Sequence, residues 1–231
     1  MIWDLSEEPQ HPDAESLYPA IRDYISEFLV LDHPFRKGKV CPYAPAAIKQ
    51  KNIFFSYAGS QTIKNTENLI EKSINEWQKK KDSGLFSALI IMLPAEFSLK
   101  SLLQIQRKKK IKYVKKQLMI GATYSINQSP SIHCSSYYPL RTETPCLIVR
   151  PLTVDDLVFL NPKHYSVLNR IKFLEKFVEK FEEKKSERIE KQVNTAKSLI
   201  LSYKHKLLTR NLVISISLAL ALPLTFFLTK L

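Results

Sequence analysis

The feature that most constrains this chain is an uncharged run close to its C-terminal end. Residues 212–229 read LVISISLALALPLTFFLT and contain no charged side chain. At 1.5 Å per residue, a helix of this length is roughly 27 Å long, which is close to the roughly 30 Å hydrocarbon core of a bilayer. Basic residues precede the run at Lys204, Lys206 and Arg210. We therefore predict a single transmembrane helix, a tail anchor over residues 211–231, with the bulk of the protein cytoplasmic. The alternative is a buried C-terminal core helix.

Upstream of residue 160 the hydrophobic pattern alternates between strand-like and helix-like segments. The expected strands are short apolar runs, and they lie at residues 53–57, 88–93, 118–124 and 145–149. The expected helices repeat apolar side chains every three to four residues, and they lie at 14–30, 65–81 and 98–116. Strands that alternate with helices indicate an α/β (or α+β) cytoplasmic domain over residues 14–160, preceded by an acidic segment at 1–13.

Residues 161–210 differ from this domain, because they form one long, charged and helical pattern. Apolar side chains recur there at heptad steps, but the polar stretch at 182–188 interrupts the apolar seam. Two interpretations remain open. The segment is either a coiled-coil stalk that joins the domain to a membrane and makes a homo-oligomer, or an amphipathic helix that folds back on the domain, with a hairpin at the polar break as one form of this.

The chain is strongly basic, with a formal net charge of +13, and its densest basic run lies on the expected helix at residues 107–116. The lysines of this run are Lys108, Lys109, Lys110, Lys112, Lys115 and Lys116. Such a run attracts anionic lipid headgroups or phosphates, so a lipid bilayer is an expected partner. A solvated helix face remains the plain alternative. Sequence-specific nucleic-acid binding is not expected, since no RNA-binding motif accompanies the run.

Two loops contain residue types that can carry chemistry. In the first loop, Cys41 precedes Pro42 and follows the basic residues Arg36, Lys37 and Lys39, which would make its thiol more reactive. In the second, His133 is followed directly by Cys134. Cys41 and His133 are therefore candidate catalytic or metal-ligating residues, and a small buried cysteine in a proline-rich loop is the alternative for Cys41.

Several common enzyme classes lack support in the sequence. No histidine pair has metallopeptidase spacing, no nucleophile-elbow motif is present, and no cysteine and histidine spacing fits a structural zinc site. No glycine-rich turn follows an expected strand, which excludes the usual dinucleotide and P-loop sites.

Two arginines flank the last expected strand of the domain. If Arg141 and Arg150 converge with Arg36 and His133, they form a cationic pocket for a carboxylate or phosphate. The alternative is that these arginines pair with acidic residues nearby. These acidic residues are Glu143, Asp155 and Asp156.

Two stretches resemble an uncharacterised bacterial domain family, over about residues 14–160. The first matching stretch holds His33-Pro34, Gly38, Val40-Cys41-Pro42-Tyr43 and Pro45-Ala46. The second holds Tyr138-Pro139-Leu140-Arg141, Pro145, Leu147, Arg150, Asp156 and Phe159-Leu160. The Cys-Pro segment before a strand is also similar, more distantly, to haem-dependent N-hydroxylases. That resemblance implies a possible haem site, with Cys41 or His133 as ligand.

Two classes of function follow from these features. In the first, the chain is a membrane-anchored sensor or effector that binds an anionic small molecule or partner protein and transmits this through the stalk. In the second, it is a membrane-tethered small-molecule enzyme, with haem-dependent oxidation of an amino or guanidino group as one possibility. The stalk and anchor favour the first class, whereas the Cys-Pro loop favours the second.

Overall fold

The computed structural model describes residues 2–60, 62–80 and 86–228, and for residues 210–228 the backbone alone. It divides the chain into two compact units, Met1–Thr153 and Val154–Leu231. The strands of the first unit are β1 (Trp3–Asp4), β2 (Ile53–Tyr57), β3 (Ala88–Met92), β4 (Leu118–Thr123) and β5 (Cys146–Pro151). Its helices are α1 (Pro12–Glu15), α2 (Tyr18–Asp23), the π-helix η1 (Tyr24–Phe28), α3 (Ala44–Lys49), α4 (Ile63–Lys80) and α5 (Leu99–Val114).

The five strands form one mixed sheet in the order β1-β2-β3-β5-β4. The central pair, β2 and β3, is parallel, with Phe54 opposite Leu89, and α4 connects the two strands. The other neighbours are antiparallel, and both Met92 and Thr123 lie opposite Cys146. Continuous apolar runs make β2 and β3 suited to the middle of the sheet, because both faces of these strands are covered.

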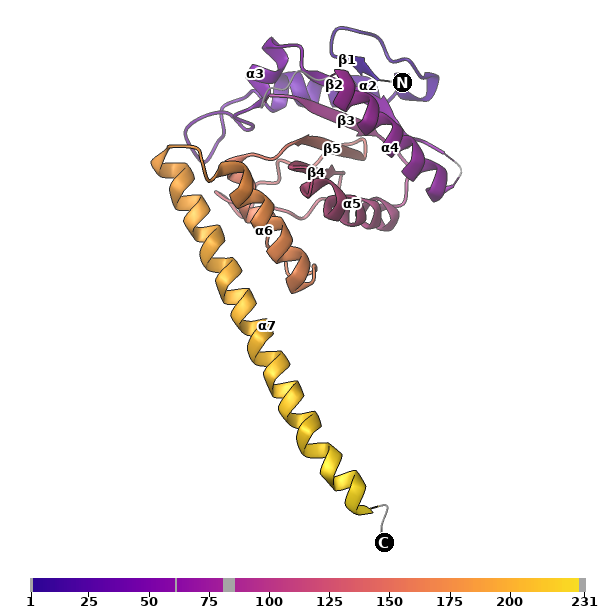
Figure 1. Cartoon of the computed structure of the whole chain (residues 1–231). Coiled ribbons are helices and arrows are strands. Elements are labelled where there is room, and N and C mark those ends of the chain that lie inside the picture. Colours follow the sequence, from indigo (N-terminus) through magenta and orange to yellow (C-terminus); the bar gives the residue numbers. More distant parts are fainter. Residues whose placement is uncertain (1, 61, 81–85, 229–231) are drawn as a thin grey trace. The chain divides into compact units, whose positions relative to one another are not determined.

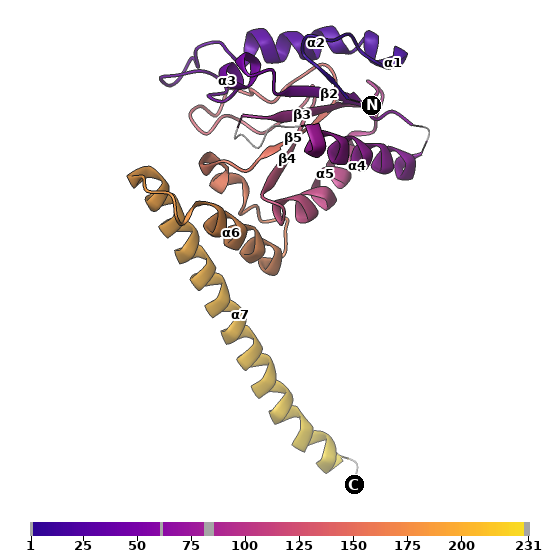
Figure 2. The same ribbon diagram turned by 45° about the horizontal axis from the view of Figure 1, so that its top comes forward.

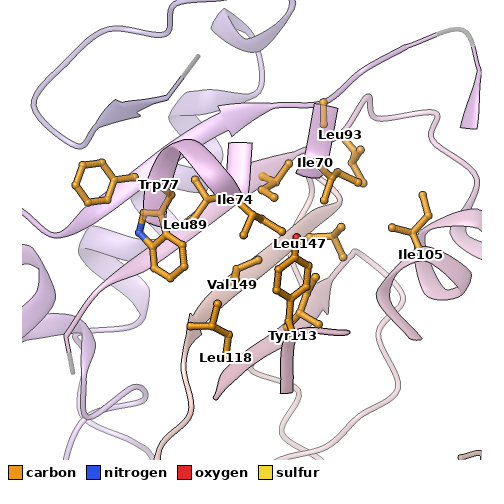
Figure 3. Packing of buried hydrophobic residues seen from close by; sticks show 14 of the residues in the cluster. Ile70, Ile74, Trp77, Leu89, Leu93, Ile105, Tyr113, Leu118, Leu147 and Val149 are labelled. Atoms are coloured by element: carbon orange, nitrogen blue, oxygen red, sulfur yellow. The ribbon is translucent and has the colours of Figure 1, made fainter. Parts of the chain in front are cut away.

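Helices cover both faces of the sheet, as the two views show (Figures 1 and 2). Figure 3 shows one face, where Ile70, Ile74 and Trp77 of α4 meet Leu89 and Leu147 of the sheet. On the other face, α1, α2, η1 and α3 pack against Ile53, Phe55 and Ile90, among others. The first unit is therefore a three-layer sandwich, and its predicted α/β organisation is correct.

One expected helix is divided. The sequence predicts a continuous helix over residues 14–30, but the structure has α1, α2 and then a π-helical turn in this region. Pro19 lies in the first turn of α2, where its missing N–H costs nothing, whereas inside a longer helix it would remove a hydrogen bond. The proline therefore separates α1 from α2.

The second unit contains the 3₁₀-helix η2 (Val154–Phe159), α6 (Val167–Phe181) and α7 (Glu187–Leu228). Helices α6 and α7 pack against each other, and Lys204 forms an ion pair with Glu175 at 2.9 Å. The heptad residues of α7 that are buried are Val193, Ala196 and Ile200. The chain turns at the polar break and folds its apolar seam onto α6. Residues 161–210 therefore form a helical hairpin, and the prediction of one continuous stalk helix is wrong.

The predicted transmembrane anchor also requires correction. In the part of the chain that the structure describes, no helix is both long and apolar enough to cross a membrane. The expected span at 212–229 lies outside the residues whose side chains are described. The structure therefore does not support the predicted anchor over 211–231 or the membrane localisation inferred from it.

Candidate functional site

The two loops that the sequence singles out lie side by side in the first unit. The first loop, residues 29–43, connects η1 to α3, and the second loop, residues 124–145, connects β4 to β5. The side chain of Tyr24, from the π-helix, joins this region to the second loop, because its hydroxyl donates a hydrogen bond of 2.7 Å to the carbonyl of Pro139. Such π-helical turns occur frequently at functional sites.

His33 lies at the contact between the loops and is only 6% exposed. Its Nδ1 accepts a hydrogen bond from the backbone N–H of Phe35 at 3.1 Å, and its Nε2 lies 3.2 Å from Ser131 Oγ. An imidazole nitrogen that accepts from an N–H cannot carry a proton itself. The neutral ring of His33 therefore has its proton on Nε2 and donates it to Ser131.

The pKa of His33 keeps this ring neutral. Burial lowers the pKa below its ordinary value, and the nearby side chains of Arg36 and His133 lower it further. Both effects disfavour the charged ring, because it would lose solvation and face other positive groups. At neutral pH His33 is therefore an uncharged donor.

Aromatic rings surround this histidine. The ring centroids of His33 and Tyr137 are 5.0 Å apart, those of Phe35 and Tyr137 are 5.7 Å apart, and those of His33 and His133 are 5.6 Å apart. The His33 ring meets its neighbours edge to face, which is a favoured aromatic geometry. We call His33, Phe35, Ser131, His133 and Tyr137 the His33 cluster.

The proton on Nε2 limits what the His33 cluster can do. A serine nucleophile needs a neighbouring base that accepts its proton, but His33 presents a donor to Ser131. A metal-bound histidine normally donates its other ring N–H to an acceptor, whereas Nδ1 of His33 faces the N–H of Phe35. The hydrogen bonds of His33 therefore favour binding an acceptor group over activating a serine or ligating a metal.

Comparison with known families matches residues 18–192 to the Domain of unknown function (DUF6875). The chain belongs to the DUF6875 family. The resemblance to an uncharacterised domain family is thus confirmed, and the matched region includes both loops of the His33 cluster. No curated protein and no solved structure matches the chain.

Two residues of the predicted cationic pocket lie at the His33 cluster, namely His133, which is part of it, and Arg36, which is next to it. Arg36 takes part through its side chain. Its guanidinium donates to the carbonyls of Lys39 at 2.6 Å and Lys37 at 3.0 Å, so it also shapes the first loop. Gly38 completes this turn with a φ of +99°, and a Cβ there would approach the Arg36 guanidinium to 3.2 Å. This conformation favours glycine, so the glycine within the DUF6875 match has a structural role.

The other two arginines each donate to a backbone carbonyl. Arg141 donates to the carbonyl of Asn127 at 2.9 Å and stacks on the ring of Tyr138, with 4.0 Å from its Cζ to the centroid. Arg150 lies on β5 and donates to the carbonyl of Pro151 at 3.2 Å. A shared pocket of the three arginines with His133 stays a prediction.

Cys41 and His133, the two candidate haem ligands, lie on different loops and differ in exposure. Cys41 is half-buried in the first loop, and its N–H donates to the carbonyl of Leu29, while His133 is exposed on a turn of the second loop. Two grooves, of about 750 and 340 Å³, lie along α7 and on α5, and neither is lined by these two residues. Within the described part of the chain, no three His, Cys, Asp or Glu side chains come together as a metal site.

The lysines expected at a membrane surface lie on α5 and have different environments. Lys109 and Lys110 are buried, whereas Lys108, Lys112, Lys115 and Lys116 are exposed. Lys109 and Lys112 form ion pairs with Glu71 of α4, and Lys108 pairs with Glu67. Burial raises the pKa of Glu71, but hydrogen bonds from Lys109, Lys112 and Tyr113 outweigh this and lower it to about 2. Much of the basic run is thus used within the sandwich.

Sequence reasoning identified the two loops but missed most residues of the His33 cluster. The residue types that signal chemistry in these loops are Cys41 and the basic residues, and nothing in the sequence sets His33, Phe35, Ser131 or Tyr137 apart from structural residues. The aromatic side chains in both loops were the available signal, since several rings in short, proline-rich connections need a place to pack.

Proposed function

We propose that this DUF6875 domain is a binding module that takes an anionic group, a carboxylate or a phosphate, at the His33 cluster. The observation that carries the proposal is the hydrogen bond from the Phe35 N–H to His33 Nδ1. Because of this bond, Nε2 carries the ring proton and donates it to Ser131. The cluster therefore offers a hydrogen-bond donor to a ligand and has no base that would take a proton from it.

Ser131 is the residue that donates a hydrogen bond to the ligand. Its Oγ accepts from His33 Nε2 and from the backbone N–H of His133, both at 3.2 Å. The hydroxyl hydrogen of Ser131 is then left to donate outward, and Ser131 is half-buried. A hydrogen bond to a charged oxygen is worth about 1.5–3 kcal/mol, and successive donors polarise one another. The positive charges of Arg36 and Lys37 add favourable electrostatics.

The test is a calorimetric titration of the full chain with phenyl phosphate at neutral pH, with benzyl alcohol as the uncharged comparison. We expect phenyl phosphate to bind and benzyl alcohol not to bind. Ser131→Ala should lower the affinity for phenyl phosphate by about tenfold or more, because it removes one charge-assisted hydrogen bond. Ser135→Ala is the matched control, since Ser135 is an exposed serine of the same loop, and it should leave the affinity unchanged.

Two results would contradict the proposal. One is equal binding of both compounds, and the other is equal binding by the Ser131→Ala and Ser135→Ala variants. Cys41→Ala separates this function from the enzymatic alternative of the Cys-Pro loop. It should leave phenyl phosphate binding intact, whereas a site centred on Cys41 would lose it.

A further inference from the structure

Both loops of the His33 cluster carry exposed apolar side chains. Five large apolar side chains are more than half exposed among the described residues of the first unit, and all but Ile63 lie on the two loops. Leu31 is 56% exposed, Phe35 is 53% exposed and Ile132, next to Ser131, is 69% exposed. Apolar side chains gathered in this way mark an interaction site more often than isolated ones do.

The same surface is positively charged. Asp32 is paired with Lys39 at 3.1 Å, so Arg36 and Lys37 supply the excess charge of the first loop. Lys37 is exposed, and the whole chain carries a net charge of +13. Opposite charge on a partner would speed association and orient it.

The exposed side chains of this surface favour a protein partner. Exposed aliphatic side chains such as Leu31 and Ile132 do not stack with bases, which disfavours single-stranded nucleic acid as the partner.

We infer that Leu31, Phe35, Lys37, Ile132 and His133, here called the loop surface, bind an acidic protein segment that carries a large apolar side chain. This inference rests on the proposed function, because a carboxylate of the segment would be the anionic group that Ser131 receives. The apolar side chain of the segment covers Phe35 and Ile132, and further acidic residues lie near Lys37 and Arg36.

The experiment is a selection of linear peptides from a random display library on the full chain. We expect the enriched sequences to combine Asp or Glu with Leu, Phe or Trp. Ile132→Ser should weaken the best synthetic peptide by about tenfold, as truncation of a central interface side chain does. Lys37→Glu should reduce the affinity for the peptide more at low salt than at high salt. Ile63→Ser is the matched control, since Ile63 is 51% exposed on α4 outside the loop surface, and it should leave the affinity unchanged.

The inference would be overturned by the absence of enrichment, by the enrichment of peptides without acidic residues, or by equal effects of Ile132→Ser and Ile63→Ser. Displacement of the peptide by a single-stranded oligonucleotide at equal affinity would also overturn it, in favour of nucleic acid. Phenyl phosphate separates the two proposals. If it still binds through Ser131 while peptides fail, only the protein partner is excluded, and if it fails too, the proposed function falls with the inference.

Discussion

The loop surface and the α4–α5 interface both draw on basic stretches of sequence, yet they use these charges differently. On α5 the lysines meet two glutamates of the neighbouring helix, and Lys109 is buried against Glu71. On the loop surface Lys37 is exposed beside apolar side chains. The denser basic run is therefore the one with the more complete internal partners. The sequence shows how many charges a segment carries. Whether these charges are available for binding depends on the helix or loop that packs against the segment.

The largest expected effect concerns Glu71. Glu71→Gln removes the charge that compensates Lys109, whose side chain is only 7% exposed. Loss of one partner of a buried ion pair leaves an uncompensated charge, and we expect a loss of about 3 kcal/mol in the free energy of unfolding. Urea unfolding of the full chain would measure it. Adding Lys109→Met should restore much of the stability, because neither charge then remains. A double variant as unstable as Glu71→Gln would contradict this explanation.

The same carboxylate gives a dependence on pH. The pKa of Glu71 is lowered from 4.5 to about 2 in the folded protein. A lowered pKa means that the folded state holds the charged form better, so this stabilisation is complete above about pH 4.5 and is lost as the pH falls towards 2. The unfolding free energies of the wild type and of Glu71→Gln should therefore converge over this range. Parallel curves would show that the charge of Glu71 is not the cause.

The sheet was predictable because its signal is local. Runs such as Ala88–Met92 are apolar throughout, which is typical of a strand covered on both faces, and α4 repeats Ile70, Ile74 and Trp77 at helical spacing. The order β1-β2-β3-β5-β4 was not predictable in this way. Pairing of β5 between β3 and β4 depends on packing between distant segments, which no local pattern records.

The candidate site was predictable only as two loops. The sequence shows that His33 and Ser131 lie 98 residues apart, and nothing local indicates that their side chains meet. The π-helical turn at Tyr24–Phe28 was also hidden, because its side chains repeat like those of an α-helix. The tautomer of His33 depends on the fold of its own turn, so the role of this residue follows from geometry and not from its type.

An intermediate effect is expected at Tyr24. Tyr24→Phe removes the hydrogen bond to the Pro139 carbonyl, which costs about 1–2 kcal/mol of unfolding free energy when a partly buried acceptor loses its donor. It should also lower the affinity for phenyl phosphate several-fold, since this bond positions the loop that carries Ser131. Urea unfolding and calorimetry would measure the two effects.

Tyr18→Phe is the matched control for Tyr24. The Tyr18 hydroxyl donates to the carbonyl of Leu5 at 3.4 Å, away from both loops of the site. We expect a smaller loss of stability and no change in the affinity for phenyl phosphate. If both variants changed the affinity equally, Tyr24 would have only a general role in stability and no role in positioning the second loop.

The smallest expected effect concerns Lys108, and it tests whether burial is what separates the α5 lysines from those of the loop surface. Lys108 pairs with Glu67 at 2.6 Å, as close as a strong ion pair, but its side chain is 65% exposed. Water screens such a pair, and ordering a long side chain offsets much of the attraction, so Lys108→Ala should change the free energy of unfolding by less than about 0.5 kcal/mol. A loss similar to that of Glu71→Gln would mean that the α5 lysines act as one cooperative network. Burial of Lys109 would then not be what separates them from the lysines of the loop surface.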